Sequence, residues 1–432
     1  MKITFIGHGY VGLVSATIFA DLGNTVHVIG HTSEKIENLK KGIIPIYEPG
    51  LQELVKRNVE AGRLIFTLDY TSISKSDAIF IAVGTPSSEN GEADLSVVFD
   101  VAGKIGKHLE KYAVVVTKST VPVGTNKKVQ QIIQNIKPKD VEFDIASVPE
   151  FLREGQAISD TLTPDRIIIG TQSKKAEKIL IDLHKPLKSN LVLCNIETAE
   201  MIKYASNAFL ATKISFANAI SQLAEKAGAD GPKVLQAVGL DKRIGANFLN
   251  AGAGYGGSCF PKDVKALIAI AQDYDYNFKL LKEVQNINQD AMMNIVEKTR
   301  KMLNNNLKDK TIAVLGLAFK PDTDDMRDAP SITIIKELTA AGAKIKTHDP
   351  IAFANAKKIF AKEKNITYSQ ELYSTVKDVE LLILLTEWNE FQQLDLNKIK
   401  SLMKNPNIID GRNIYDPQKV KELGFNYIGV GR

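Results

Sequence analysis

Short apolar runs alternate with helix-like stretches through the first 200 residues. In the helix-like stretches apolar residues recur every three or four positions, whereas the short runs have the length of strands. The strand-like runs cover residues 3–6, 26–29, 78–83, 114–116, 143–148 and 166–169, and the helix-like stretches include 11–22 and 36–41. This rhythm predicts parallel βαβ units in a doubly wound sheet. We place the end of this first domain at residue 196.

A second region differs from the first because it reads as continuous helix. Residues 197–227 contain no proline and no glycine, and their apolar positions follow one helical face. A loop rich in glycine, alanine and asparagine follows at 245–257, with more helix through residue 303. We therefore predict a central helical region over residues 197–305.

The α/β rhythm returns in the last third of the chain. Strand-like runs lie at residues 311–316, 344–347, 381–385 and 407–410. The sequence thus predicts an α/β protein with two Rossmann-like, doubly wound parallel-sheet domains, 1–196 and 306–432, joined by a long central helix. Such sheets bind ligands at the carboxyl ends of their strands, so we expect the active site in the cleft between the domains.

Composition narrows the class of protein. The 432 residues are 44% hydrophobic and 24% charged, without an apolar run of about 18 residues that could span a bilayer. The net charge of +5 comes from scattered lysines, which does not predict binding to nucleic acid. Two cysteines and a first strand without signal-peptide features favour a reducing, cytoplasmic location.

A glycine fingerprint follows the first strand. Gly7-His8-Gly9-Tyr10-Val11-Gly12 fits the dinucleotide pattern GxGxxG, and it opens a helix. Glycines there allow a tight turn, so that a pyrophosphate can lie on the helix N-terminus. The alternative is a plain glycine-rich turn. Thr85, Pro86 and Thr120 follow later strands and could line the same ligand.

The end of the second strand departs from this fingerprint. An acidic residue normally accepts the ribose hydroxyls there, but this chain has Gly30 followed by His31, with Lys35 one turn further on. Without the carboxylate, basic and hydroxyl side chains could hold a 2′-phosphate. The pattern leaves two hypotheses open, an NAD site that lacks one hydrogen bond and an NADP site.

Cys259 lies in surroundings that favour a reactive thiol. It follows Gly256-Gly257-Ser258, stands at the expected start of a helix, and has Lys262 and Asp263 close by. Such positions lower the pKa of a thiol. The alternative is a buried small hydrophobic residue, and this is our interpretation of Cys194 in its apolar strand.

Two further groups of polar residues could act on a substrate. Lys203 and Asn207 are four residues apart on the long helix, so they share one face. Glu150 and Glu154 follow the strand at 143–148 and could serve as a general base or position water. The alternatives are a solvated surface lysine and acids at a helix start.

These segments together resemble the UDP-glucose/GDP-mannose dehydrogenase family over nearly the whole chain. The similarity is carried by Gly7–Gly12, Glu48–Leu51, Val83–Pro86, Ser119–Thr125, Pro149–Gly155, Ala199–Tyr204, Gly254–Asp263, Gly316–Lys320 and Asp410–Arg412. The resemblance implies oxidation of the C6 alcohol of a nucleotide-linked hexose to a carboxylate in two hydride transfers. The form of Gly257–Asp263 is similar to the branch that oxidises UDP-glucose.

The resemblance also implies roles for individual residues. Cys259 would be the nucleophile, Lys203 and Asn207 would stabilise an oxyanion, and Asp263, Glu150 and Thr120 would hold water. The substrate would contact Glu150, Phe151, Leu152, Glu154, Lys203, Asn207, Phe248, Leu249, Gly256, Phe260, Lys320 and Arg412, and Arg243 from a neighbouring subunit. The cofactor, NAD or NADP, would contact Gly7, Gly9, Tyr10, Val11, Gly12, Gly30, His31, Lys35, Thr85, Pro86, Thr120, Glu154, Lys262 and Arg327. A homodimer through the central helix is implied, and no metal.

Three rival hypotheses remain. The substrate could be another nucleotide sugar, such as GDP-mannose or a UDP-N-acetylhexosamine. A hydroxyacid or phosphogluconate type of dehydrogenase would share the early folds, but a single hydride transfer does not need Cys259. A nucleotide-sugar sensor would bind without reaction, and it would need none of the residues Cys259, Lys203, Asn207 and Asp263.

Overall fold

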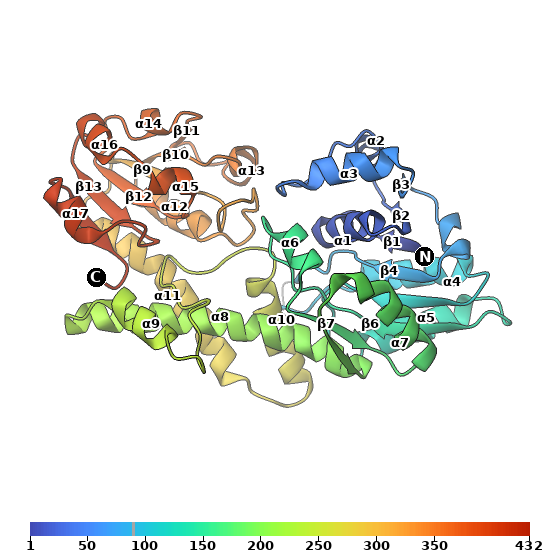
Figure 1. Cartoon of the computed structure of the whole chain (residues 1–432). Helices are drawn as coiled ribbons and strands as arrows, with labels where there is room; N and C mark the ends of the chain where they lie inside the picture. The colour runs from blue at the N-terminus through green and yellow to red at the C-terminus, as the bar shows by residue number, and fades with distance from the viewer. Residues whose placement is uncertain (89–90) are drawn as a thin grey trace. The chain divides into compact units, whose positions relative to one another are not determined.

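Two compact units make up the chain in a computed structural model, which describes residues 1–88 and 91–432 (Figure 1). Unit 1 consists of Met1–Ser206 and Lys265–Tyr276, and unit 2 consists of Asn207–Val264 and Asn277–Arg432. Each unit is built around one sheet. The three-part division at residues 196 and 305 stays a prediction.

The sheet of unit 1 has eight strands in the order β3-β2-β1-β4-β5-β6-β7-β8. Neighbouring strands are parallel except at one place, where Ser147 of β6 pairs with Gly170 of β7 in antiparallel fashion. The predicted doubly wound parallel sheet is thus confirmed, with β7 and β8 reversed at one edge. The strands are β1 (Lys2–Ile6), β2 (Thr25–Ile29), β3 (Leu64–Thr67), β4 (Ala78–Ile81), β5 (Ala113–Thr117), β6 (Phe143–Ser147), β7 (Arg166–Gly170) and β8 (Asn190–Cys194).

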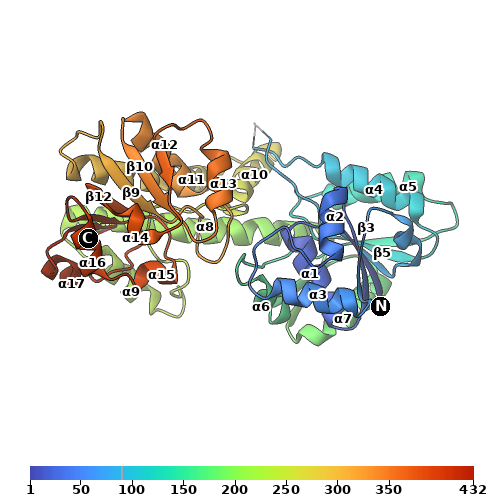
Figure 2. The same cartoon turned by 90° about the horizontal axis from the view of Figure 1, so that it is seen from above.

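Helices cover both faces of this sheet because its strands are apolar on both sides (Figure 2). Phe5 and Phe80 stack with ring centroids 4.6 Å apart on the face covered by α1, α3 and α7, whereas Ile6 and Ile79 face α4 and α5. Each fully buried phenylalanine contributes roughly 2–3 kcal/mol to stability. The helices are α1 (Tyr10–Asp21), α2 (Ser33–Lys40), α3 (Leu51–Glu60), α4 (Ser96–His108), α5 (Thr125–Ile136), α6 (Ala157–Leu162) and α7 (Lys174–His184), with short 3₁₀ turns η1 (Thr71–Lys75) and η2 (Lys185–Leu187).

The last strand of this sheet, β8, corrects one prediction. Its side chains are largely exposed, with Leu193 46% exposed, and Cys194 is only partly buried. The interpretation of Cys194 as a buried residue was therefore wrong. An apolar run indicates a strand, but it does not reveal that the strand lies at a sheet edge.

The predicted long helix is α8 (Ile196–Ala227), and the boundary between the units falls inside it. Glu200 fastens its first turns within unit 1, because the carboxylate accepts from the amides of Gly124 (2.7 Å) and Asn126 (2.9 Å). Within unit 2, Asn218 accepts from the amide of Gly252 at 2.8 Å. The other helices of the central region are α9 (Gly231–Gly239), α10 (Phe260–Asp273) and α11 (Lys279–Met302). In the described part of the chain, no helix has the length and apolarity that crossing a membrane requires.

The sheet of unit 2 has six parallel strands in the order β11-β10-β9-β12-β13-β14. Ile312 and Val314 pack on one face and Ala313 and Leu315 on the other, so this sheet is also covered on both sides. The second predicted doubly wound domain is confirmed. Its elements are β9 (Thr311–Leu315), α12 (Pro330–Ala340), β10 (Lys344–His348), α13 (Phe353–Ile359), β11 (Ile366–Tyr368), α14 (Leu372–Thr375), β12 (Leu381–Leu384), α15 (Asn389–Gln392), α16 (Leu396–Leu402), β13 (Asn407–Asp410), α17 (Pro417–Glu422) and β14 (Asn426–Gly429).

Candidate active site

The glycine loop between β1 and α1 has one open position and two crowded ones. A Cβ at Gly7 would lie 2.3 Å from the Ala82 carbonyl oxygen, and one at Gly12 would lie 2.2 Å from that of Gly7. Among the residues that the structure describes, Gly9, the N-cap of α1, has no neighbour within 4 Å of such a Cβ, and no side chain caps the helix. The first amides of α1 are thus not used by a capping side chain and lie beside a bare backbone, which fits the pyrophosphate of a dinucleotide.

Glu48 ties the start of α1 to the segment that follows β6. Its buried carboxylate accepts from the Tyr10 hydroxyl and from the amides of Gly155 (2.7 Å) and Ala157 (2.8 Å). Burial, and then the bond to Glu48, raises the pKa of Tyr10. Val11 lies beside Tyr10 in the first turn of α1. The role of Glu48 was missed, although Glu48-Pro49-Gly50 was among the recognised motifs.

Of the candidates at the carboxyl end of β2, Gly30 is buried and the other two lie at the surface of unit 1. Gly30 directly follows the strand, and its amide donates to the carbonyl of Thr67 at 3.0 Å. His31 and Lys35 are exposed; His31 precedes α2, and Lys35 lies in its first turn. The ring of His31 lies 5.0 Å, centroid to centroid, from the buried ring of His8.

Thr85 and Thr120 come together because they follow the neighbouring strands β4 and β5. The Thr85 hydroxyl donates to the Thr120 carbonyl at 2.8 Å. Pro86 comes next in the chain, and its carbonyl accepts from the amide of Asp94 at 2.8 Å. These three candidates therefore lie at the same sheet edge as the glycine loop.

Glu150 and Lys203 form a buried ion pair in unit 1. Their side chains are only 7% and 4% exposed, and Lys203 Nζ lies 2.9 Å from Glu150 Oε1. The other carboxylate oxygen accepts from the Leu152 amide at 2.9 Å. Lys203 is thus not a solvated surface lysine, and Glu150 does not begin a helix, since α6 begins at Ala157.

The residues next to this ion pair are also packed. Arg166 of β7 lies over the ring of Phe151 at 4.1 Å, and Lys203 Nζ is 5.3 Å from the same ring. Leu152 packs against the core, and Glu154 is buried. Arg166 is a neighbour that the sequence did not reveal.

Lys118 is a second buried lysine beside the ion pair. It directly follows β5, and burial lowers the pKa of its amine to about 8. The negative charge of Glu150 raises this pKa, and the positive charge of Lys203 lowers it, so all three groups lie within electrostatic range. Its segment, 118–122, was expected to line the cofactor, but nothing in the local pattern indicated that the side chain of Lys118 is buried.

In unit 2, Cys259 lies immediately before α10, as predicted. Its carbonyl accepts from the Asp263 amide at 2.8 Å, and the Ser258 hydroxyl lies 3.6 Å from its sulfur. The preceding glycines are sterically required. A Cβ at Gly256 would lie 2.3 Å from the Asp328 carbonyl oxygen, and Gly257 has φ +88°.

Asp263 is the centre of a polar network around this helix start. Its side chain is fully buried, and one carboxylate oxygen accepts from Asn207 Nδ2 at 2.6 Å. The other oxygen forms an ion pair with Lys262. The structure therefore brings Asn207, Lys262 and Asp263 together beside the backbone of Cys259.

The aromatic and basic candidates of unit 2 are spread over several loops. Phe248 has a left-handed backbone (φ 65°), and its ring centroid is 6.1 Å from that of Phe260, with Leu249 buried next to it. Arg412 donates to the Leu385 carbonyl at 2.8 Å. The remaining basic candidates have local partners: Lys320 lies over the Phe319 ring, Arg327 pairs with Asp325, and Arg243, 89% exposed, pairs with Asp241.

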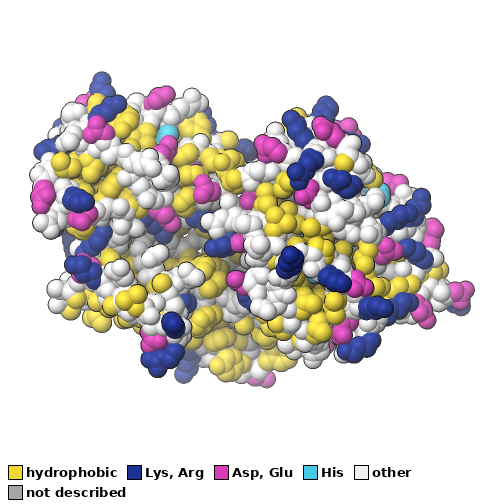
Figure 3. Space-filling view, in the orientation of Figure 1, with side chains coloured by type: hydrophobic (Ala, Val, Ile, Leu, Met, Phe, Trp, Pro, Cys, Tyr) yellow, Lys and Arg dark blue, Asp and Glu magenta, His cyan; other side chains and the backbone are white. Residues whose placement is uncertain are grey.

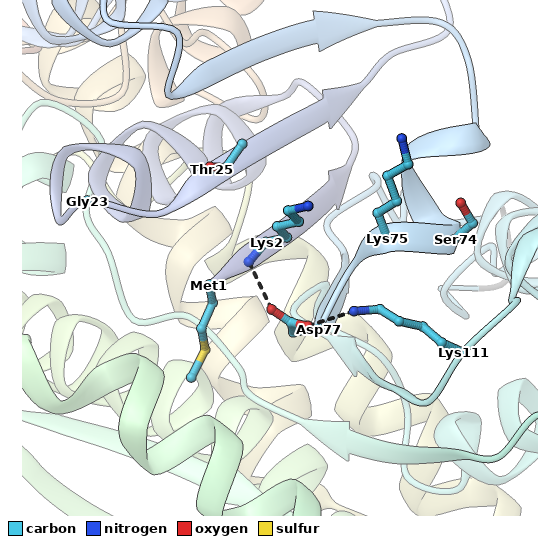
Figure 4. A pocket seen from close by; sticks show the side chains of 8 residues that line it. All are labelled: Met1, Lys2, Gly23, Thr25, Ser74, Lys75, Asp77 and Lys111. Atoms are coloured by element: carbon cyan, nitrogen blue, oxygen red, sulfur yellow. Dashed lines mark hydrogen bonds and ion pairs between the residues drawn. The ribbon is translucent and has the colours of Figure 1, made fainter.

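A surface hollow of about 560 Å³ lies at the amino ends of strands in the unit 1 sheet, at the opposite end of these strands from the glycine loop (Figure 4). It is bordered by the amino ends of β1 and β2, and Asp77 within it accepts from the Lys2 amide (3.0 Å) and from Lys111 (2.8 Å). Ligands of such sheets bind at the carboxyl ends, so this hollow is not the candidate site.

Comparison with known proteins identifies the family. Models of the UDP-glucose/GDP-mannose dehydrogenase family match residues 1–188 (NAD binding domain), 197–290 (central domain) and 313–417 (UDP binding domain). The chain belongs to the UDP-glucose/GDP-mannose dehydrogenase family. This confirms the resemblance seen in the sequence.

Individual members of the family resemble the chain over its full length. "UDP-glucose 6-dehydrogenase TuaD" from Bacillus subtilis is 49% identical, over 100% of this chain and 93% of the relative. A UDP-glucose dehydrogenase structure from Pyrobaculum islandicum has a TM-score of 0.93 at 37% identity, covering 100% of this chain and 97% of that one. A UDP-D-ManNAc dehydrogenase structure from Pyrococcus horikoshii has a TM-score of 0.88 at 28% identity, covering 100% and 99%.

Proposed function

We propose that the chain is a nicotinamide-dinucleotide-dependent UDP-glucose 6-dehydrogenase. It oxidises the C6 alcohol of UDP-glucose to the carboxylate of UDP-glucuronate. The observation that carries this proposal is the polar set around Cys259, in which a fully buried Asp263 is held by Asn207 and Lys262. Burying a carboxylate costs free energy, and binding a sugar nucleotide does not require one beside a thiol. The names of the relatives support UDP-glucose as the substrate.

Two oxidations are needed, and the cysteine links them. The dinucleotide, when bound at the glycine loop, accepts the hydride in each oxidation. The first oxidation turns the alcohol into an aldehyde with loss of one proton. The thiolate of Cys259 then adds to the aldehyde carbon, and loss of the second hydride leaves a thioester. Water hydrolyses the thioester to the carboxylate and frees the thiol, so the aldehyde never leaves the protein.

Lys203 and Asn207 stabilise the negative oxygen that forms at C6. The proposed role suits Lys203, whose ammonium group is buried, because donors in a water-poor site stabilise developing charge more strongly than exposed ones. Both residues lie on α8, four positions apart.

Water for the last step is held by Asp263, Glu150 and Thr120. The buried carboxylate of Glu150 is paired with Lys203, which fixes its position for contact with the water. Asp263 is paired with Lys262. The substrate would contact the residues that the resemblance implies, including Phe260, Lys320 and Arg412.

We further propose a homodimer through α8. Phe209, Phe216 and Leu223 are 66%, 50% and 63% exposed, and they recur every seven residues along the helix. Exposed apolar residues at this spacing are typical of a helix that packs against another. Apolar side chains gather on the lower side of the space-filling view, where Figure 1 draws α8 (Figure 3). In such a dimer, the exposed Arg243 would reach the substrate of the neighbouring subunit.

The test is a turnover experiment run to completion. Purified protein is mixed with limiting UDP-glucose and excess NAD or NADP, and absorbance at 340 nm is followed. We expect two reduced cofactors per sugar, and roughly a 10³-fold or greater loss of rate for Cys259→Ser, since the nucleophile is removed. Cys194→Ser, at the edge of unit 1, is the matched control and should keep full activity.

Each of the other outcomes of this experiment would favour one of the rival hypotheses. One reduced cofactor per sugar with an unaffected Cys259→Ser variant would favour a dehydrogenase of the hydroxyacid type. Tight binding of UDP-glucose without any reduction would favour a sensor. Turnover only with GDP-mannose or a UDP-N-acetylhexosamine would keep the mechanism and change the substrate.

A further inference from the structure

The backbone at the end of β2 is shaped around a histidine. A Cβ at Gly30 would lie 2.9 Å from Nδ1 of His8 and 2.6 Å from Cδ1 of Ile36. Cγ1 of Ile36 is also 2.9 Å away, and both residues are buried, but the Ile36 side chain has rotatable bonds whereas the His8 ring is rigid. A side chain at position 30 therefore requires Ile36 to change rotamer and His8 to change position, and His8 and Gly30 form a matched pair.

The side chain of His8 carries a ring nitrogen, Nδ1, that makes no hydrogen bond within the described part of the fold. In the part of the chain that the structure describes, Nδ1 of His8 is buried and has no hydrogen-bond partner. Burial lowers the pKa of His8, and the charges of His31 and Lys35 lower it further, so these three basic groups lie within electrostatic range. The N-terminus of α2 lies at the same point and is not capped by a side chain.

In a dinucleotide-binding sheet, the residue that ends the second strand meets the adenosine ribose. A carboxylate there accepts the 2′-hydroxyl and repels a 2′-phosphate, whereas basic donors attract the phosphate. Here His8 and Ile36 leave no room for a carboxylate side chain, and the ribose position is bordered by basic groups. Of the two acids on α2, Glu37 is paired with Lys40 at 2.8 Å, and Glu34, in the first turn, is exposed, so that solvent screens its charge.

We propose that the carboxyl end of β2 carries a subsite for the 2′-phosphate of NADP, formed by His8, Gly30, His31 and Lys35. The inference rests on the proposed function only in taking the glycine loop as the dinucleotide site. It makes NADP the preferred oxidant, and it makes His8 and Gly30 jointly the residues that determine this preference.

Binding of cofactor fragments tests the subsite without any turnover. Titration calorimetry compares adenosine 2′,5′-bisphosphate with 5′-AMP, which lacks only the 2′-phosphate. We expect the bisphosphate to bind at least roughly tenfold more tightly. Lys35→Ala should remove most of this difference, whereas Lys41→Ala, an exposed lysine next to the same helix, should leave it unchanged. Equal affinity for the two nucleotides would overturn the proposal.

Substitutions at the matched pair test the coupling. Gly30→Asp alone should weaken both nucleotides, because the new side chain meets His8. His8→Ala with Gly30→Asp should bind 5′-AMP better than the bisphosphate, and should reverse the ratio of kcat/KM for NADP and NAD. A reversal by Gly30→Asp alone would show that His8 does not control the site. If no nucleotide sugar is oxidised, the proposed function is wrong. The ratio of the affinities for adenosine 2′,5′-bisphosphate and 5′-AMP still tests the subsite in that case.

Discussion

The two sheets have the same turn after their first strands, β1 and β9, but different residues after the neighbouring strands, β2 and β10. Gly7 after β1 and Gly316 after β9 both have positive φ, and each donates its amide at 2.9 Å to the last residue of the neighbouring strand. The next residue beyond that strand is Gly30 in unit 1 and Asp349 in unit 2. The same turn therefore has a bare backbone in one unit and a carboxylate in the other.

That carboxylate occupies the amides that a ligand would need. Asp349 is buried and accepts from the amides of Leu317 (2.7 Å), Ala318 (3.1 Å), Ile351 (3.0 Å) and Ala352 (2.8 Å). In unit 1 no side chain caps α1. A shared topology thus leaves the amides at this turn open to an anion only where the chain does not satisfy them itself.

Removing the carboxylate of Asp349 should strongly destabilise unit 2. Asp349→Ala leaves several buried amides without an acceptor, and we expect a loss of about 3–5 kcal/mol in the free energy of unfolding. The only tryptophan of the chain, Trp388, donates to Asp349 at 3.4 Å, so urea unfolding followed by its fluorescence reports on this site. Asp349→Asn should lose less, because one oxygen remains. An unchanged transition for Asp349→Ala would refute the role given to the carboxylate.

Substitutions in the glycine loop of unit 1 should affect dinucleotide binding and stability separately. Gly9→Ala meets no neighbour and should unfold like the parent, yet its methyl group would lie where a pyrophosphate approaches, so dinucleotide affinity should fall roughly 30–100-fold. Gly12→Ala collides with the Gly7 carbonyl and should also lose about 2–3 kcal/mol of stability. Calorimetry with the dinucleotide and urea unfolding measure the two effects. Unimpaired binding by Gly9→Ala would place the cofactor elsewhere.

The smallest expected effect concerns the buried charge of Lys118. Its pKa is lowered from 10.5 to about 8 in the folded chain, so between these values the unfolded chain binds more protons and stability rises with pH. Below about pH 8 the full cost of burying the charge applies. Lys118→Met should therefore raise stability by about 1–3 kcal/mol at pH 7 and reduce this pH dependence.

The control for this variant is Lys111→Met, whose ammonium group is partly exposed and paired with Asp77. It should change stability by less than about 0.5 kcal/mol at either pH. A Lys118→Met variant that is less stable at pH 7 would mean that the interaction with Glu150 outweighs the cost of burial.

Local signals predicted the fold and part of the site, whereas long-range packing did not show in the sequence. The periodicity of residues 197–227 predicted α8, and Gly7–Gly12 predicted the loop, because both depend on neighbours in the chain. The burial of Lys118 and the bonds of Glu48 depend on partners far away in sequence. The exposure of Cys194 depends on where its strand lies in the sheet.

The division of unit 1 into two chain segments has a consequence for synthesis. Its last part, Lys265–Tyr276, is made after the first stretch of unit 2 that begins at Asn207. At roughly 5–20 residues per second, a ribosome adds this part several seconds after Ser206. The nascent chain must therefore keep an incomplete first unit in solution, and a fragment that stops at the end of its sheet lacks residues that this unit needs.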